Sequence, residues 1–298
     1  MHIPHIPADV PNSAAQEYLK NYAAITKDSG RLMLFACDQK IEHLNNDFYG
    51  TNIAPDALNP EHLFTIARDG INGAFATHFG LAARYGRKYP TLNYIIKLNG
   101  KTDCIPTSEQ DPFSAQLWTV EQALALKTNA HINVCGVGYT LYLGSEFESQ
   151  MLQDAANVIY QAHQAGLIAI LWIYPRGKYI KDDIAPHLVA GAAGIAASLG
   201  ADFVKLKAPH NVDDLAIAVK AAGNTQVICS GGQSKEPALF LQELYNQIHN
   251  GQAAGSATGR NIFQKPLPEA IAFTKAIGAI VLYNQKVESA LSLYNARS

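Results

Sequence analysis

The sequence predicts a single α/β domain, a closed (β/α)8 TIM barrel with an extra helix at each end, and three observations lead to this prediction. Eight short apolar runs alternate with longer segments of helical periodicity, the pattern of βα units around a parallel sheet. The chain has 298 residues, a normal length for one such barrel, and 48% of them are hydrophobic, which supplies a large core. Because no Pro- or Ser-rich linker divides the sequence, residues 1–298 are expected to form one domain.

The expected strands are apolar runs of four to six residues. In chain order they cover residues 32–37, 73–78, 94–98, 132–137, 168–173, 203–206, 226–229 and 253–257. An open doubly wound sheet would show the same local alternation, but no Gly-x-Gly-x-x-Gly follows the first run to support it. A closed barrel is therefore the preferred interpretation.

Helical periodicity fills the segments between these runs. In 149–165, for example, Leu152, Ala156, Ile159 and Ala162 recur at helical spacing. The same rhythm predicts helices over 183–199, 213–221, 237–250 and 268–277, an extra helix within the first 27 residues and an extra terminal helix over 279–294. Gly200 is a typical C-terminal stop for the helix before it.

Composition and charge exclude several classes of protein. The formal net charge is -2, and no basic stripe indicates a nucleic-acid partner. No apolar run approaches the ~20 residues of a membrane span, and the first residues lack the features of a secretory signal. The cysteines contain no Cys-x-x-Cys pair, so reduced cysteines in a cytoplasmic protein are expected rather than a zinc or redox motif. They are Cys37, Cys104, Cys135 and Cys229.

In a barrel of this kind, catalytic groups lie at the C-terminal ends of the strands and in the loops that follow. Asp38 follows the first strand, where it either moves protons and orients a nearby lysine or caps the next segment. Lys40, Glu42 and His43 are expected in the loop beyond it, with a smaller chance of direct involvement. Lys97 ends the third strand. At this position it is expected either to contact a phosphate or to lie near a reactive amine, and a solvated loop lysine is the alternative.

The fourth and fifth strands carry glycines and aromatic residues at their ends. Gly136, Gly138 and Gly144 suit either a close approach of the backbone to a ligand or ordinary turns. Trp172 and Tyr174 are two residues apart and therefore point to the same side of the strand. A phenol at this position is a candidate general acid, and aromatic packing is the alternative for both residues.

The sixth strand contains the feature most specific for chemistry, in the run Gly200-Ala-Asp-Phe-Val-Lys-Leu-Lys207. A lysine in an apolar buried strand is costly unless it has a function. Lys205 and Lys207 share one face, and a neighbouring cation together with desolvation lowers the pKa of an amine. The sequence therefore predicts a neutral lysine nucleophile, since a solvated edge strand is not available in a closed barrel.

The loops after the last two strands are expected to bind a phosphate. Backbone N–H groups and a helix N-terminus face the anion at this place in many barrels. The expected phosphate-binding residues are Ser230, Gly231, Gly232, Gly259 and Arg260, together with Lys97 and Lys207. Glycines allow the close approach, and the arginine supplies a bidentate donor.

Taken together, these motifs resemble the archaeal-type class I fructose-bisphosphate aldolases, within the superfamily that includes deoxyribose-phosphate aldolase. The most specific motifs are Gly200-Ala-Asp-x-x-Lys205 and Trp172-x-Tyr-Pro-Arg-Gly177, and the resemblance spans roughly 32–264. It implies that Lys205 is the Schiff-base lysine, that Tyr174 transfers protons beside Trp172, and that Asp38 is the carboxylate of the first strand. It also implies a lyase of glycolysis and gluconeogenesis that forms homo-oligomers and needs no metal or other cofactor.

The sequence departs from the family pattern at two places. Lys40 stands where the family has a glycine, and residues 45–60 form an unusual loop. The expected reaction is cleavage of a phosphorylated ketose, foremost fructose 1,6-bisphosphate, into dihydroxyacetone phosphate and glyceraldehyde 3-phosphate. Three alternatives remain open: a related Schiff-base enzyme for another sugar phosphate (of the deoxyribose-phosphate, amino-heptulosonate synthase or acyl-transfer type), a metal-dependent aldolase, and a non-catalytic sugar-phosphate sensor. The metal alternative lacks the clustered histidines it needs, because no His-x-His or His-Glu-x-x-His occurs.

Overall fold

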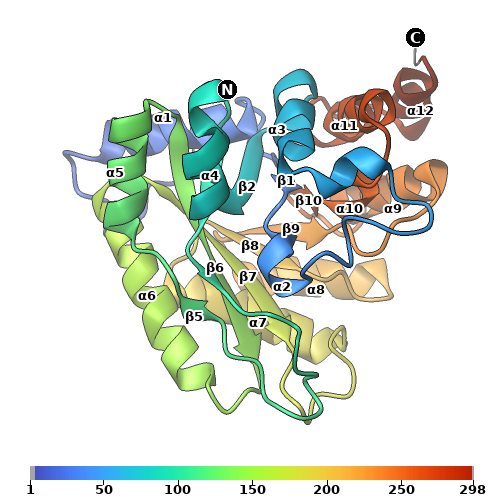
Figure 1. The fold of residues 1–298 in the computed structure, drawn as a ribbon. Coiled ribbons are helices and arrows are strands. Elements are labelled where there is room, and N and C mark those ends of the chain that lie inside the picture. Colours follow the sequence, from blue (N-terminus) through green and yellow to red (C-terminus); the bar gives the residue numbers. More distant parts are fainter. Residues whose placement is uncertain (1–3, 297–298) are drawn as a thin grey trace.

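The computed structural model describes residues 4–296, which form a closed barrel of parallel strands surrounded by helices (Figure 1). Around the barrel the strands follow the order β1-β10-β9-β8-β7-β6-β3-β2. Their bounds are β1 Leu32–Ala36, β2 Ala74–His78, β3 Tyr94–Lys97, β6 Val134–Leu143, β7 Ile168–Pro175, β8 Phe203–Leu206, β9 Gln226–Ser230 and β10 Gly255–Thr258. The predicted fold class is confirmed, and all eight expected runs are barrel strands.

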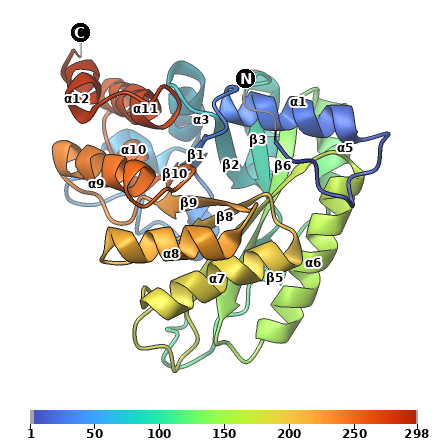
Figure 2. The same ribbon diagram turned by 180° about the vertical axis from the view of Figure 1, so that it is seen from behind.

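The helices lie on the outside of the barrel, as Figures 1 and 2 show. The longer ones are α1 Ala15–Thr26, α3 Pro60–Asp69, α4 Phe79–Tyr85, α5 Val120–Ala130, α6 Glu148–Gln164, α7 Pro186–Leu199, α8 Val212–Ala222, α9 Pro237–His249, α11 Leu267–Val281 and α12 Val287–Asn295. Short turns of helix, α2 Gln39–Glu42 and α10 Arg260–Phe263, follow the first and last strands, and 3-10 turns span Pro55–Leu58 and Gly86–Lys88. Among the described residues no helix is both long and apolar enough to cross a membrane.

Three details of the predicted elements are wrong. The terminal helix expected over 279–294 is instead the end of α11 followed by a separate α12, because Asn284 takes a left-handed backbone conformation with φ 55° and ends the helical path. Strands β6 and β7 continue past Val137 and Ile173, where the pattern placed their ends. A two-stranded antiparallel sheet, β4 Asn99–Gly100 with β5 Ala115–Gln116, lies outside the barrel and was not predicted.

The strands read as continuous apolar runs because both of their faces are buried. Residues such as Leu34, Ile170 and Phe203 point into the barrel, while neighbours such as Phe35 and Leu171 pack against the helices. The barrel closes where β1 pairs with β10. There Gly255 has φ 148°, and an added Cβ would lie 2.0 Å from the Leu32 carbonyl oxygen, so only glycine fits this closure.

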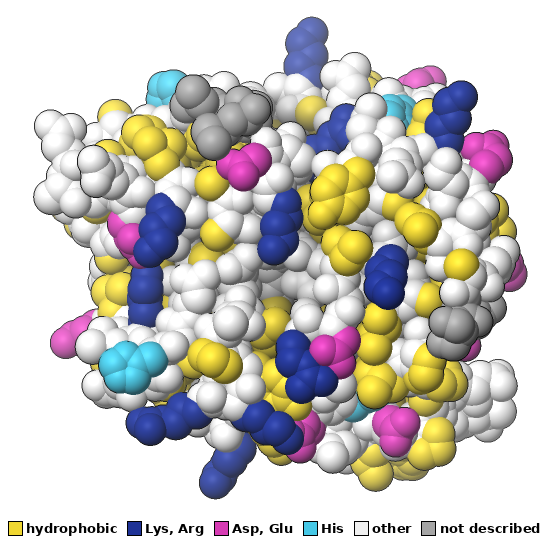
Figure 3. All heavy atoms as spheres, turned by 90° about the horizontal axis from the view of Figure 1, so that it is seen from above, with side chains coloured by type: hydrophobic (Ala, Val, Ile, Leu, Met, Phe, Trp, Pro, Cys, Tyr) yellow, Lys and Arg dark blue, Asp and Glu magenta, His cyan; other side chains and the backbone are white. Residues whose placement is uncertain are grey.

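Helix α1 lies across the end of the barrel opposite the strands' C-termini, and Figure 3 views the molecule from that side. Tyr22 of this helix stacks on Phe203 with ring centroids 5.8 Å apart, which closes the bottom of the barrel interior. On the face in Figure 3, positive and negative side chains are dispersed rather than gathered into a basic stripe.

A buried histidine ties the N-terminal segment to the barrel at this end. The Nδ1 atom of His163 lies 2.8 Å from Asp9, and its Nε2 atom lies 3.2 Å from Asp202. Asp202 also accepts hydrogen bonds from the Tyr18 hydroxyl at 2.7 Å and the Ala169 N–H at 2.8 Å. Burial alone would lower the pKa of His163, but the two carboxylates outweigh it and raise the pKa to about 9.

This arrangement predicts that the protein loses stability as the pH rises through about 9. The folded-state pKa of His163 is raised, so its contribution is complete below the unfolded value of about 6.5 and disappears as pH passes the folded value. Thermal unfolding measured between pH 6 and pH 10 checks this. His163→Gln is expected to flatten the decline, and an equally steep decline in that variant would contradict the assignment.

Candidate active site

A cavity of about 350 Å³ opens at the C-terminal ends of the barrel strands. It is lined by ten of the eleven predicted site residues: Asp38, Trp172, Tyr174, Lys205, Lys207, Ser230, Gly231, Gly232, Gly259 and Arg260. Lys97 is the exception, although its ammonium contacts Asp38 and Trp172, which do line the cavity. The fold therefore gathers residues from five strands, far apart in sequence, around one space, as expected for a barrel active site.

Lys205 lies in β8 and points into the barrel, where only 6% of the residue is exposed. Its ammonium lies 5.5 Å from the centre of the Trp172 ring. Burial lowers the pKa of this amine to about 8; Asp38 acts in the opposite direction, and Lys97 adds to the lowering. At neutral pH a far larger fraction of this amine is neutral than of an exposed lysine, which suits a nucleophile.

The neighbouring cation is Lys97 and not Lys207, which corrects one part of the sequence interpretation. Strand β8 ends at Leu206, so Lys207 lies in the loop beyond it and forms an ion pair with Asp183. Lys97 is 4% exposed, and its ammonium lies 5.1 Å from the centre of the Trp172 ring. The two lysines that share the tryptophan ring thus come from β3 and β8. Strand periodicity alone does not reveal such a pair.

Asp38 follows β1, and its charge acts on both buried lysines. Its Oδ2 atom is 3.4 Å from the Lys97 Nζ atom. Burial would raise the pKa of Asp38, but the charges of Lys97 and Lys205 outweigh it, so the pKa is lowered and the carboxylate is ionised at neutral pH. Its side chain makes no capping hydrogen bond to α2, so the alternative role as a helix cap is wrong. A charged, buried carboxylate within reach of both lysines is a candidate base.

The two glycines of β6 serve packing. Gly136 and Gly138 lie inside the strand, so the prediction of turn residues is wrong for these two, whereas Gly144 lies in the turn after β6 with φ 78°. An added Cβ at Gly138 would lie 2.4 Å from the Trp172 ring, and one at Gly136 would lie 2.4 Å from the Ile168 carbonyl oxygen. The glycines therefore make room for the neighbouring strand β7 and its tryptophan, not for a ligand.

Tyr174 lines the cavity beside an arginine that the sequence interpretation overlooked. The guanidinium of Arg176 lies 5.2 Å from the Tyr174 ring centre and donates from Nη1 to Glu42 Oε1 at 2.7 Å. The Tyr142 hydroxyl donates to the same oxygen at 2.8 Å. Burial and the nearby carboxylates raise the pKa of Tyr174, so its phenol stays protonated and can donate a proton. Arg176 stands in the quoted Trp-x-Tyr-Pro-Arg-Gly motif, which was the available signal.

Lys40, where the sequence was expected to depart from the family pattern, is not among the residues that line the cavity. Its ammonium lies 3.7 Å from the centre of the Phe48 ring and 3.4 Å from the Leu58 carbonyl oxygen. Phe48 in turn stacks on Phe263 at 4.8 Å. The unusual loop at 45–60 is therefore packed against α10, the turn that follows the last strand. Lys40 contacts this loop and does not narrow the pocket.

The predicted phosphate-binding loops meet at one side of the cavity. Arg260 opens α10 and donates from Nε to the Gly232 carbonyl at 3.2 Å and from Nη1 to Gln233 Oε1 at 3.0 Å. Asn261, which was not predicted, donates to the carbonyls of Gly231 and Gln233 and so joins the two loops. Gly232 adopts φ 67°, a conformation that glycine favours. A guanidinium and a glycine-rich loop at one place suit an anion.

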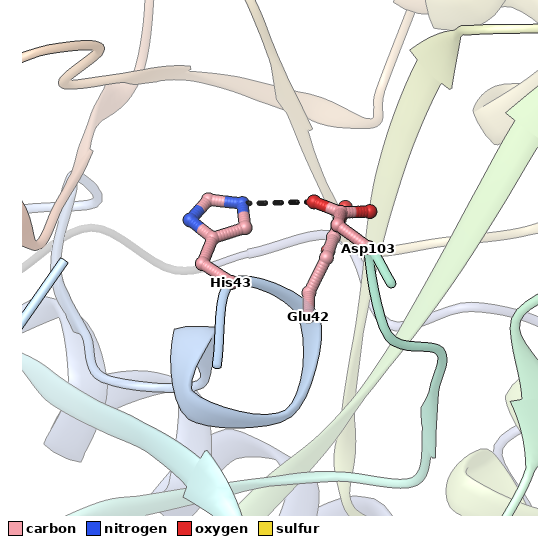
Figure 4. Close-up of side chains that lie close together, drawn as sticks. All are labelled: Glu42, His43 and Asp103. Atoms are coloured by element: carbon pink, nitrogen blue, oxygen red, sulfur yellow. Dashed lines mark ion pairs between the residues drawn. The ribbon is translucent and has the colours of Figure 1, made fainter. Parts of the chain in front are cut away.

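Glu42 and His43 line the cavity, and Asp103 lies beside them, with possible metal-ligand atoms of the three within 4.8 Å of one another (Figure 4). Each carboxylate already has a protein cation as a partner. Glu42 pairs with Arg176 at 2.7 Å, and Asp103 pairs with Lys101 at 2.5 Å. A bound metal ion would lie close to these cations, so the cluster is better explained as a network of ion pairs.

The site combines a buried lysine of lowered pKa with an ionised carboxylate, a protonated phenol and a pair of loops suited to an anion. In a closed barrel, this combination defines a class of enzyme in which an amine nucleophile attacks a phosphorylated carbonyl compound. The model of the DeoC/LacD family aldolases matches residues 32–265. The chain belongs to this family, and the resemblance seen in the sequence is confirmed.

Individual relatives agree with this assignment. The chain is 51% identical over 292 residues, 97% of this chain and 94% of the relative, to a Methanocaldococcus jannaschii protein called fructose-bisphosphate aldolase/6-deoxy-5-ketofructose 1-phosphate synthase. A fructose-bisphosphate aldolase structure from Slackia heliotrinireducens superposes with a TM-score of 0.97 at 50% identity, covering 99% of this chain and 94% of that chain. An archaeal fructose-1,6-bisphosphate aldolase whose catalytic lysine is covalently bound to the carbinolamine intermediate superposes with a TM-score of 0.78 at 32% identity, covering 90% and 99%.

Proposed function

We propose that this protein is a class I aldolase that cleaves fructose 1,6-bisphosphate into dihydroxyacetone phosphate and glyceraldehyde 3-phosphate through a Schiff base on Lys205. The observation that carries the proposal is the buried Lys205 amine, whose pKa is lowered to about 8 at the centre of the cavity. A sensor that only bound a sugar phosphate would not need a neutral amine there. The relatives named as fructose-bisphosphate aldolases support the choice of substrate.

The reaction begins at the ketone. The neutral Lys205 amine attacks the substrate's C2 carbonyl, and loss of water from the carbinolamine leaves an iminium. The ring of Trp172, 5.5 Å from the Lys205 ammonium, supports the positive charge of this group. The phosphate next to the ketone is held by Ser230, Gly231, Gly232, Gly259 and Arg260, with Lys207 at the edge of the cavity. Binding at this end fixes the ketone against the amine.

Asp38 and Tyr174 divide the proton transfers. Asp38 has a lowered pKa and Tyr174 a raised one, so the carboxylate rather than the phenol accepts the C4 hydroxyl proton. The C3–C4 bond then breaks, its electrons move to the iminium, and the aldehyde leaves. Tyr174 protonates C3 of the resulting enamine, and water hydrolyses the regenerated iminium to free dihydroxyacetone phosphate.

A second activity at the same site is favoured by the relative that is 51% identical and carries two activities in its name. Cleaving 6-deoxy-5-ketofructose 1-phosphate between C3 and C4 on paper yields dihydroxyacetone phosphate and a three-carbon ketoaldehyde without phosphate. The enamine on Lys205 can add to that aldehyde as it adds to glyceraldehyde 3-phosphate. This synthase activity would share every step up to the choice of aldehyde.

Borohydride trapping tests the proposal. Incubation with dihydroxyacetone phosphate followed by reduction is expected to leave one stable adduct, and peptide mass spectrometry is expected to map it to Lys205. The reason is that borohydride reduces the iminium to a secondary amine that no longer hydrolyses. An unmodified protein, or an adduct on a different lysine, would overturn the assignment of the nucleophile.

The cellular setting follows from the family resemblance. We propose that residues 1–298 work as one domain in the cytoplasm, as a homo-oligomer, in carbohydrate metabolism through glycolysis and gluconeogenesis. The four cysteines are free, and three of them are buried, which suits a reducing compartment.

A further inference from the structure

Two arginines line the cavity on opposite sides of Lys205. In the barrel, β8 lies between β7 and β9, and β10 follows β9. Arg176 comes directly after β7, while Arg260 opens the turn after β10. A substrate joined to Lys205 through its second carbon therefore has an arginine near each of its two halves. The loops around Arg260 suit the phosphate beside the ketone, which leaves Arg176 for the aldehyde half.

The two guanidinium groups have different partners. Arg260 donates to neutral groups, the Gly232 carbonyl and the Gln233 amide oxygen, and its closest carboxylate, Asp47, lies at 3.5 Å. Arg176 instead forms a direct hydrogen-bonded ion pair with Glu42 at 2.7 Å. The positive charge of Arg176, near the aldehyde half, is thus already neutralised by the Glu42 carboxylate.

The Glu42–Arg176 pair is held in place on several sides. The oxygen that faces Arg176 also accepts a hydrogen bond from the Tyr142 hydroxyl at 2.8 Å. The guanidinium lies 5.7 Å from the Tyr142 ring centre and 5.2 Å from that of Tyr174. The side chains of Glu42 and Arg176 are only 20% and 28% exposed, so solvent screens the pair incompletely.

A phosphate on the aldehyde half must therefore compete with a carboxylate for the same guanidinium. The gain from a new ion pair is reduced by the loss of the existing one. An aldehyde without phosphate leaves the internal pair intact and no arginine unpaired. We propose that Glu42 is a specificity-determining residue: it occupies Arg176 and thereby weakens the preference for ketoses phosphorylated at both ends over ketoses phosphorylated only beside the ketone. This inference rests on the proposed function and would serve both activities described there.

The test compares fructose 1,6-bisphosphate with fructose 1-phosphate in Glu42→Gln. The amide keeps the size of the side chain and the Tyr142 contact but releases the charge of Arg176. We expect KM for the bisphosphate to fall about three- to tenfold while KM for the monophosphate changes less than about twofold. Because Glu42 also raises the pKa of Lys205, the variant changes the amine for both substrates, and the ratio of the two kcat/KM values removes that shared effect.

Asp103→Asn is the matched control. Asp103 lies in the same cluster and its loss adds the same charge, but it forms ion pairs with Lys101 and His43, and its charge acts on Arg176 without a direct ion pair. The ratio of kcat/KM values is expected to stay unchanged in this variant. A ratio that rises equally in both variants would show a general charge effect and overturn the proposal.

A second background isolates the competition. In Arg176→Met, adding Glu42→Gln is expected to leave the substrate ratio unchanged, since no guanidinium remains to be released. A rise in the ratio in that background, or an equal loss of kcat for both substrates in Glu42→Gln alone, would overturn it. Borohydride trapping with dihydroxyacetone phosphate separates the two proposals. A Lys205 adduct together with an unchanged ratio of kcat/KM values in Glu42→Gln would contradict only the role of Glu42. A missing adduct would contradict the proposed function itself.

Discussion

Replacing Lys205 with methionine is expected to lower kcat/KM for fructose 1,6-bisphosphate by a factor on the order of 10⁴ or more and to abolish the borohydride-stable adduct. Methionine keeps the length of the side chain but has no amine, so neither the carbinolamine nor the iminium forms. Without the iminium as an electron sink, cleavage of the C3–C4 bond has no route for its electrons. Steady-state kinetics and mass spectrometry of the trapped protein measure the two effects.

The fold is expected to tolerate this change. Lys205 is 6% exposed in an apolar strand, and its removal relieves the burial of an amine. Lys207→Met is the matched control, since Lys207 lies two residues away, lines the same cavity and forms an ion pair with Asp183. That control is expected to keep the adduct and to lose affinity at most. If the Lys205 variant keeps turnover, or the Lys207 variant loses the adduct, the nucleophile is misassigned.

Replacing Asp38 with asparagine is expected to lower kcat by about 10²–10⁴-fold, since the amide cannot accept the C4 hydroxyl proton. The variant also carries a signature that a purely structural defect would not produce. Asp38 raises the pKa of Lys205, and Lys97 and burial lower it, with the balance at about 8. Removing the carboxylate therefore lowers the pKa of the amine further.

The pH dependence of kcat/KM reads out this shift. In the unmodified protein kcat/KM is expected to rise with pH to a plateau above about 8, because the neutral amine is the reactive form. In Asp38→Asn this rising limb of the pH profile is expected at lower pH. Lys97→Met removes the opposite charge of the same ion pair and is expected to move the limb to higher pH. Limbs that stay at the same pH in both variants would show that the pair does not control the amine.

The sequence pattern predicted the strands well because both faces of a parallel barrel strand are buried and its residues are almost all apolar. Against that background a lysine in β8 is conspicuous, and Lys205 was identified for this reason. Asp38 and the loops after β9 and β10 were identified because each lies directly after a strand. These predictions depended only on local sequence and on one general property of barrels.

The errors have a common origin. Lys207 was taken as the neighbour of Lys205 because the two are adjacent on one strand, whereas the actual neighbour, Lys97, comes from β3 across the barrel. Gly136 and Gly138 of β6 were assigned to turns or to a ligand, although the Ile168 carbonyl oxygen requires the first and the Trp172 ring requires the second, both on the adjacent strand β7. Each of these errors depends on which strands lie beside or across from one another, and strand periodicity carries no information about that.

By itself, the amino-acid sequence determined the barrel, and it led to the proposed reactive lysine and to the strand ends where a carboxylate, a phenol and a phosphate site were predicted. Local burial and strand ends are sufficient for these. Only the tertiary structure decided which charges act on one another: Asp38 with Lys97, Glu42 with Arg176, and Lys40 with Phe48 away from the cavity. Electrostatic effects depend on distance and burial in three dimensions, and the partners of the first two pairs, more than 50 residues apart in the chain, meet only when the barrel closes.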